Sequence, residues 1–207
     1  MSTESLCEQL LAAPDDASRG TLLEEAARTA DCLAYLLETA RDTLAAQPAY
    51  ASRRAELAIA IADRRDDARG ASAAWRLHAQ ARRAEGAHAE AERALQMAST
   101  LAASAGERLL AAQAQIGRID SLGWLGRYDE AAALARRLER ELLALNAPQD
   151  AAMALVNLGS LHYRRDQYDQ ALRCYRRALG DLAGTGDALA TARIEANIAN
   201  VLVELNR

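Results

Sequence analysis

The sequence predicts an all-α protein: a right-handed α-solenoid of antiparallel helix hairpins that recur about every 40 residues. The first reason is composition, because the 51% hydrophobic fraction consists mostly of Ala and Leu, which are strong helix formers. β-branched residues are few, which disfavours sheet. The second reason is that the apolar residues of segment 152–179 recur at helical spacing. The third is that this segment has copies elsewhere in the chain.

Segment 152–179 contains two apolar stripes separated by a short polar break at 167–169. The first stripe runs at i, i+3, i+4 and i+7 and consists of Leu155, Leu158, Gly159 and His162. The second stripe consists of Ala171, Tyr175 and Ala178. Two helices with one apolar face each form a hairpin that cannot bury its own core, so the hairpin needs neighbouring copies.

The copies recur about every 40 residues along the chain, and we call this step one repeat. Tyr168 and Ala171 correspond to Tyr128 and Ala131, and the tripeptide Asn157-Leu158-Gly159 returns as Asn197-Ile198-Ala199. Ile119 occupies the position that corresponds, one repeat later, to Gly159. We therefore predict that the chain is an array of related hairpins.

The hairpin resembles a tetratricopeptide repeat (TPR), whose pattern is Trp-x-x-Leu-Gly-x-x-Tyr in the first helix and Ala-x-x-x-Phe, with a later Pro, in the second. The matching residues are Leu155, Leu158, Gly159, His162, Ala171 and Tyr175, and Ala183 stands where the Pro would fall. The common repeat of that family has about 34 residues, so we expect longer helices here. The resemblance implies a scaffold that binds a protein or peptide segment.

Long repeats of this kind are similar to those that precede caspase-like CHAT peptidase domains in bacteria, and to those inside large bacterial transcription activators. The opening segment 7–26 also resembles the helical lead-in of CHAT-domain proteins. The resemblance implies a bacterial, cytoplasmic, non-enzymatic module that regulates or recruits a C-terminal effector domain. The alternative is the sensor or interaction segment of a transcription regulator.

In chain order, we expect a helical lead-in over 1–31, with a helix at 3–12 that ends near Pro14 and a second helix at about 16–30 capped by Asp15 and Asp16. The array then occupies 32–207. Its units are about 32–71, 72–106, 107–147, 148–186 and an incomplete 187–207. In the first unit, Pro48 begins the second helix. Gly70 is expected to close that helix and Ser72 to cap the next.

The last unit stops after one helix capped by Asp187. We expect its Val201, Leu202 and Leu205 to be exposed on a face that lacks a partner helix. The chain is therefore interpreted as part of something longer, or as one that self-associates through this C-terminal edge.

Charge and motifs exclude several classes of function. The net charge of −4 argues against general nucleic-acid binding, and the absence of Lys excludes a P-loop or Schiff-base lysine. No basic-then-apolar leader and no uncharged apolar run long enough for a membrane span is found.

The three widely spaced cysteines, Cys7, Cys32 and Cys174, favour neither a disulfide framework nor a zinc site. We expect no catalytic residue, cofactor or metal, and we interpret the three histidines as packing residues.

The candidate site is the groove lined by the first helix of each hairpin. Stepping along the chain by one repeat gives ladders of residues that face this groove, such as Asp120, Ser160 and Asn200, or Ile116, Val156 and Ala196. We predict that Trp124 and Tyr163 anchor an apolar side chain, and that Arg164 and Arg193 favour an acidic ligand. The predicted peptide-binding residues are Trp124, Tyr163, Asp120, Ser160, Asn200, Arg164, Arg193, Met153 and Val156. The alternative for Trp124 is simple packing on its neighbour.

Overall fold

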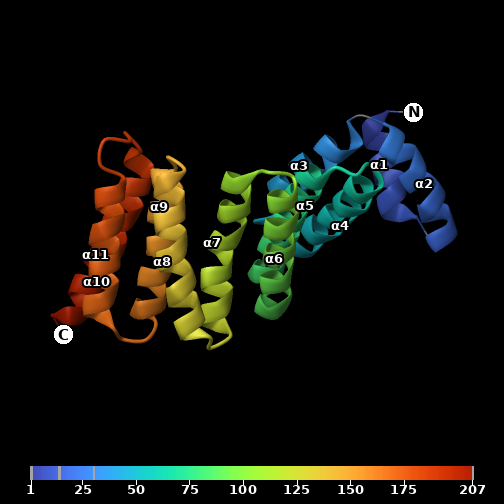
Figure 1. Cartoon of the computed structure of the whole chain (residues 1–207). Coiled ribbons are helices and arrows are strands. Elements are labelled where there is room, and N and C mark those ends of the chain that lie inside the picture. The colour runs from blue at the N-terminus through green and yellow to red at the C-terminus, as the bar shows by residue number, and fades with distance from the viewer. Residues whose placement is uncertain (1, 14, 30, 207) are drawn as a thin grey trace. The chain divides into compact units, whose positions relative to one another are not determined.

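The computed structural model describes residues 2–13, 15–29 and 31–206. These residues form eleven helices and no strand, so the all-α prediction is confirmed (Figure 1). The helices are α1 Thr3–Ala12, α2 Asp16–Arg28, α3 Cys32–Thr43, α4 Pro48–Arg64, α5 Ala68–Ala84, α6 His88–Ser104, α7 Arg108–Trp124, α8 Tyr128–Ala144, α9 Pro148–Tyr163, α10 Tyr168–Asp181 and α11 Ala188–Leu205. Two compact units are present, Met1–Ala114 and Gln115–Arg207. Consecutive helices pack together from α1 to α6 in the first unit and from α8 to α11 in the second.

From α4 onward the helix starts are evenly spaced along the chain, and two successive steps make up one repeat. The starting residues are Pro48, Ala68, His88, Arg108, Tyr128, Pro148, Tyr168 and Ala188. Most of these helices are 17 residues long. The period seen in the sequence is therefore the sum of two nearly equal helices and their short loops.

The six loops from α4 to α10 share one geometry. Each contains a residue with positive φ, followed by a residue whose N–H donates back to the carbonyl of the residue five positions earlier, at 2.8–3.0 Å. This is the Schellman motif, which satisfies carbonyls left over at a helix end. The left-handed residues are Asp66, Gly86, Gly106, Gly126, Asn146 and Asp166. Gly tolerates this conformation without strain, and Asp and Asn are the next best choices.

One predicted helix boundary is wrong. Gly70 and Ser72 lie inside the first turns of α5 and do not separate two helices. The break comes earlier, where Asp66 adopts φ 53° and the Asp67 carboxylate accepts a 2.8 Å hydrogen bond from the Gly70 N–H. Ser72 is buried, and its hydroxyl donates to the Ala98 carbonyl at 2.8 Å, so it joins α5 to α6.

The hairpin cores combine one large residue with one small one at equivalent positions. In the fourth hairpin, Gly159 of α9 faces the Tyr175 ring so closely that a Cβ on Gly159 would lie 2.5 Å from a ring carbon. One repeat earlier the order is reversed, because Ile119 and Ala135 occupy these places and both are fully buried. The corresponding pair in α5 and α6 is Ala79 with Leu95, in one apolar cluster. The Ile at the third copy's glycine position is thus matched by a small residue on the next helix.

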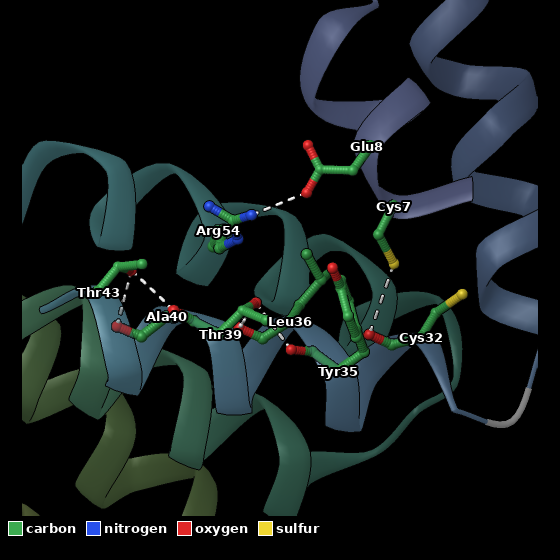
Figure 2. Close-up of polar contacts among 9 residues, drawn as sticks. All are labelled: Cys7, Glu8, Cys32, Tyr35, Leu36, Thr39, Ala40, Thr43 and Arg54. Carbon is green, nitrogen blue, oxygen red and sulfur yellow. Dashed lines mark hydrogen bonds and ion pairs between the residues drawn. The ribbon is translucent and has the colours of Figure 1, made fainter. Parts of the chain in front are cut away.

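The predicted lead-in, segment 1–31, does not form a separate layer in the first unit. Leu6, Leu10 and Leu23 are buried in the same apolar cluster as Leu36 and Ile61 of α3 and α4. Figure 2 shows a polar connection beside this cluster, in which the Arg54 guanidinium of α4 donates to the Glu8 carboxylate of α1 at 2.8 Å.

The same region contains two of the three free thiols. Cys7 and Cys32 are fully buried, and the Cys7 sulfur lies 4.0 Å from the Cys32 carbonyl (Figure 2). Burial, with Cys32 beside it, raises the pKa of the Cys7 thiol to about 12. Cys7 therefore packs as a neutral apolar residue at neutral pH.

At the other end, α11 packs on α9 and α10 and buries more than the sequence suggests. Val201, predicted to be exposed, is fully buried among apolar residues of α9 and α10, so that prediction is wrong. Leu202 and Leu205 are 40% and 42% exposed, as predicted. The helix turns Val201 inward because the position lies on the same face as Ile194, two helical turns earlier, which is also buried.

A buried carboxylate links α8 to α10. Glu139 is 2% exposed and forms an ion pair with Arg177, and Asp181 lies near enough to add repulsion. Burial raises the pKa of Glu139 above 4.5, and the attraction of Arg177 does not compensate for it. Because the folded state holds this proton more tightly than the unfolded state, the stability contributed by Glu139 is complete below pH 4.5 and is lost as pH rises through the folded pKa.

We therefore expect Glu139→Gln to become increasingly stabilising, relative to the parent, as pH is raised from 4.5 to 7. Urea unfolding at several pH values measures this difference. The matched control is Glu130→Gln on the same helix, because the hydrogen bond from Arg127 lowers the pKa of Glu130. Its stability contribution is present above the unfolded pKa, so the control should lose stability at pH 7. Parallel profiles for the two variants would contradict the assignment.

Candidate functional site

The nine predicted peptide-binding residues lie on or just after α7, α9 and α11, and all belong to the second unit. An asparagine side chain helps to hold two of these helices together, since the Asn157 amide of α9 donates to the Ile116 carbonyl of α7 at 3.1 Å. The nine residues do not form one continuous site. They divide into a charged aromatic cluster, two residues occupied by internal contacts, an exposed Asn200, and a cavity between α9 and α11.

The charged aromatic cluster consists of Asp120, Trp124 and Arg164. The Arg164 guanidinium donates to the Asp120 carboxylate at 2.9 Å and lies over the Trp124 ring, 4.8 Å from its centroid. Trp124 is nevertheless 58% exposed, the largest exposed aromatic surface among the described residues. The ion pair contributes at most about 1 kcal/mol and the cation–π contact about 0.5–1 kcal/mol. Together they fix the orientation of an indole that the core does not cover.

A glycine makes this arrangement possible. A Cβ on Gly123 of α7 would lie 3.1 Å from an Arg164 guanidinium nitrogen and 2.5 Å from a Leu161 methyl group. Gly123 thus allows α9 and the Arg164 side chain to approach α7 directly beside Trp124. Repeat spacing selects Trp124, Arg164 and Asp120 but does not identify Gly123, whose only signal in the sequence is its place next to the tryptophan.

Ser160 and Tyr163 have internal partners. The Ser160 hydroxyl shares a 3.2 Å hydrogen bond with the Tyr175 hydroxyl. The Tyr163 ring packs edge-on against Tyr168, with centroids 5.7 Å apart. The Tyr168 hydroxyl donates to Asp166 at 2.8 Å, which raises the pKa of Tyr168 to about 12. These residues fix the end of α9 beside the exposed cluster.

The cavity between α9 and α11 has a volume of about 290 Å³ and contains three of the predicted residues, Met153, Val156 and Arg193. Repeat spacing also placed Ala196 on this face, in the same ladder as Val156, but it did not identify the other residues around the cavity. These are Gln149, Ala152, Leu182, Ala190, Ile194 and Asn197. The walls are mainly aliphatic, and polar groups lie only at a few points.

The side chains best suited to catalysis, His162, His78 and Cys174, lie in surroundings that favour a structural role. His162 shares a 2.7 Å hydrogen bond with Gln167, and His78 contacts Ser52 at 3.0 Å and the Trp75 ring edge-on. Burial raises the pKa of Cys174, which disfavours the reactive thiolate. In the described ranges, no three His, Cys, Asp or Glu residues gather in a way that would hold a metal ion. None of the helices in these ranges is both long and apolar enough to cross a membrane.

No protein-family model and no curated protein matches the sequence. Among solved structures, the chain is similar to the crystal structure of BtubC (BKLC) from P. vanneervenii, with a TM-score of 0.54 and 16% sequence identity. The alignment covers 86% of this chain and 82% of BtubC. A likeness at this level of identity shows a shared helical, repeat-like fold.

Proposed function

We propose that the chain is a non-enzymatic, TPR-like module that binds a protein or peptide segment on the α7–α9–α11 side of the second unit. The observation that carries the proposal is the exposed Trp124 side chain, held in place by Arg164 and Asp120. Tryptophan and arginine are among the residues enriched in binding hot spots, because they combine large apolar area with directional contacts. Internal packing does not account for an indole that is 58% exposed.

The expected partner is an acidic segment that carries one apolar side chain. Arg164 uses part of its planar fork on Asp120, and a guanidinium can bind a second carboxylate with its remaining donors. Arg193 adds a second exposed cation on α11. The apolar part of the partner would lie against the exposed part of the Trp124 ring.

The setting that the sequence resemblance favours is regulation or recruitment of a CHAT peptidase-like effector domain in the bacterial cytoplasm. The second candidate is the interaction segment of a bacterial transcription regulator, which the same resemblance supports. The complete reading frame separates the two. A domain with a His/Cys peptidase pair encoded downstream favours the first, and a helix-turn-helix favours the second.

The test is a selection of binding peptides from a displayed random library, followed by measurement of Kd. Trp124→Ala should weaken the selected peptides by about 2 kcal/mol or more, roughly thirtyfold, because the anchor is removed. Arg164→Glu should also weaken them, and more at low salt than at high salt. Far-UV circular dichroism checks that both variants keep their helices.

The matched control is Met97→Ala on α6 of the first unit, where an apolar side chain is 46% exposed. Binding should not change in this variant. If the selected peptides bind the Trp124→Ala and Arg164→Glu variants as tightly as the parent, the partner uses another surface and the proposed site is wrong.

A further inference from the structure

The cavity between α9 and α11 arises from a loss of side-chain volume along one ladder of the repeat. At equivalent positions one repeat apart, α7 carries Ile116, α9 carries Val156 and α11 carries Ala196. Ile116 is buried, whereas Val156 and Ala196 line open space. The shortest side chain therefore lies on the helix where the cavity opens.

A second difference between the repeats, at the residue next to Ala196, leaves a polar group facing the cavity. Between α7 and α9, the Asn157 amide donates to the Ile116 carbonyl at 3.1 Å. The equivalent bond between α9 and α11 would join the Asn197 amide to the Val156 carbonyl, and it is not made between these two described residues. Asn197 instead lines the cavity, where its amide can serve a ligand.

The charge of the cavity has one sign. Arg193 is the only charged residue that lines it, and no ion pair joins Arg193 to another residue in the described ranges. The apolar wall includes Met153, Val156 and Ile194. An aliphatic body with a single negative end is the chemistry that such a wall and a single guanidinium recognise, because the fork of Arg pairs with a carboxylate.

We infer that this cavity binds a small aliphatic monocarboxylate, with its chain against Met153, Val156 and Ile194 and its carboxylate at Arg193 and Asn197. If each non-hydrogen atom of a ligand takes about 30 Å³, the volume of one molecule in liquid water, a cavity of about 290 Å³ holds roughly ten such atoms. That is the size of octanoate. This ligand class goes beyond the proposed binding of a protein segment, which rests on Trp124.

The experiment uses the whole chain, labelled with carbon-13 at the methionine methyl groups. Met153 lines the cavity and Met97 lies on α6 of the first unit, so the two methyl signals are a reporter and an internal control. Octanoate should shift the Met153 signal with a Kd on the order of 1 mM, which is typical for an efficient ligand of this size, and leave Met97 in place. Octylammonium and octan-1-ol lack the negative charge, and acetate lacks the long alkyl chain. Each should therefore bind at least about threefold more weakly than octanoate.

Two variants test the geometry. Ala196→Leu fills the cavity and should weaken octanoate about tenfold or more, whereas Ala199→Leu, an exposed position of α11 outside the cavity, should not. Arg193→Gln replaces an exposed side chain without disturbing the fold, and should reduce octanoate binding at least about threefold while leaving octan-1-ol unaffected.

Several results would overturn the inference. They are the absence of a Met153 shift at concentrations about tenfold above the expected Kd, an equal shift at Met97, and equal binding of octanoate and octylammonium. Octanoate binding that Arg193→Gln leaves unchanged would also do so. Because no protein partner is used, these results are independent of the test on Trp124.

Discussion

Gly159→Ile should lower the free energy of unfolding by about 3 kcal/mol, because even a Cβ at this position would collide with the Tyr175 ring at 2.5 Å. Tyr175→Ala should cost about 3–5 kcal/mol, since it empties a buried aromatic site. The double variant should be more stable than the sum of the two losses predicts, by about 1 kcal/mol or more. It recreates the order found one repeat earlier, where Ile119 and Ala135 occupy the same places.

Urea unfolding of the parent, the two single variants and the double variant measures the coupling. Gly180→Ala is the control, because nothing lies within 4 Å of a Cβ added there, and this helical position should gain up to about 1 kcal/mol. If the two losses are strictly additive, the residues are not a packed pair. The repeat alignment that places Ile119 opposite Ala135 would then be wrong.

Deletion of segment 1–31 should destabilise the first unit by about 5 kcal/mol or more. Leu6, Leu10 and Leu23 are buried in one cluster with residues of α3 and α4, and each fully buried side chain of this size contributes about 1.5–3 kcal/mol. The deletion also removes Glu8, leaving Arg54 buried without its carboxylate partner. The expected result is loss of cooperative structure in α3 and α4.

Amide hydrogen exchange measures this loss helix by helix. Protection in α3 and α4 should fall sharply, while protection in α9 and α10 of the second unit should stay within error of the parent. The second unit thus serves as an internal control for the quality of the preparation. Unchanged protection in α3 and α4 would show that the lead-in is an independent appendage.

Local signals in the sequence were sufficient for most helix ends. Asp15 and Asp187 were predicted as caps, and both carboxylates accept a hydrogen bond from the backbone N–H three positions on. Pro48 begins α4 as expected. The error at Gly70 and Ser72 arose because Asp66 supplies a left-handed turn that a glycine more commonly supplies, so the true stop signal was less visible.

The candidate site was only partly accessible from spacing. Periodicity selected Asp120 and Trp124 on one helix and Arg164 one repeat further along, and the structure brings these three side chains together. It could not show that Ser160 is engaged by Tyr175, since that contact depends on how deeply one ring enters beside Gly159. The cavity beside Ala196 likewise depends on a difference of a few carbon atoms between equivalent positions.

The even spacing of the helix starts has a kinetic consequence. In the second unit, helices contact their neighbours along the chain or the next helix but one, so no long loop has to close before native contacts form. Folding can then begin at any adjacent pair of helices and spread outward, without one obligatory nucleus. Proteolysis and hydrogen exchange should therefore report graded local openings, each governed by the strength of one interface between neighbouring helices.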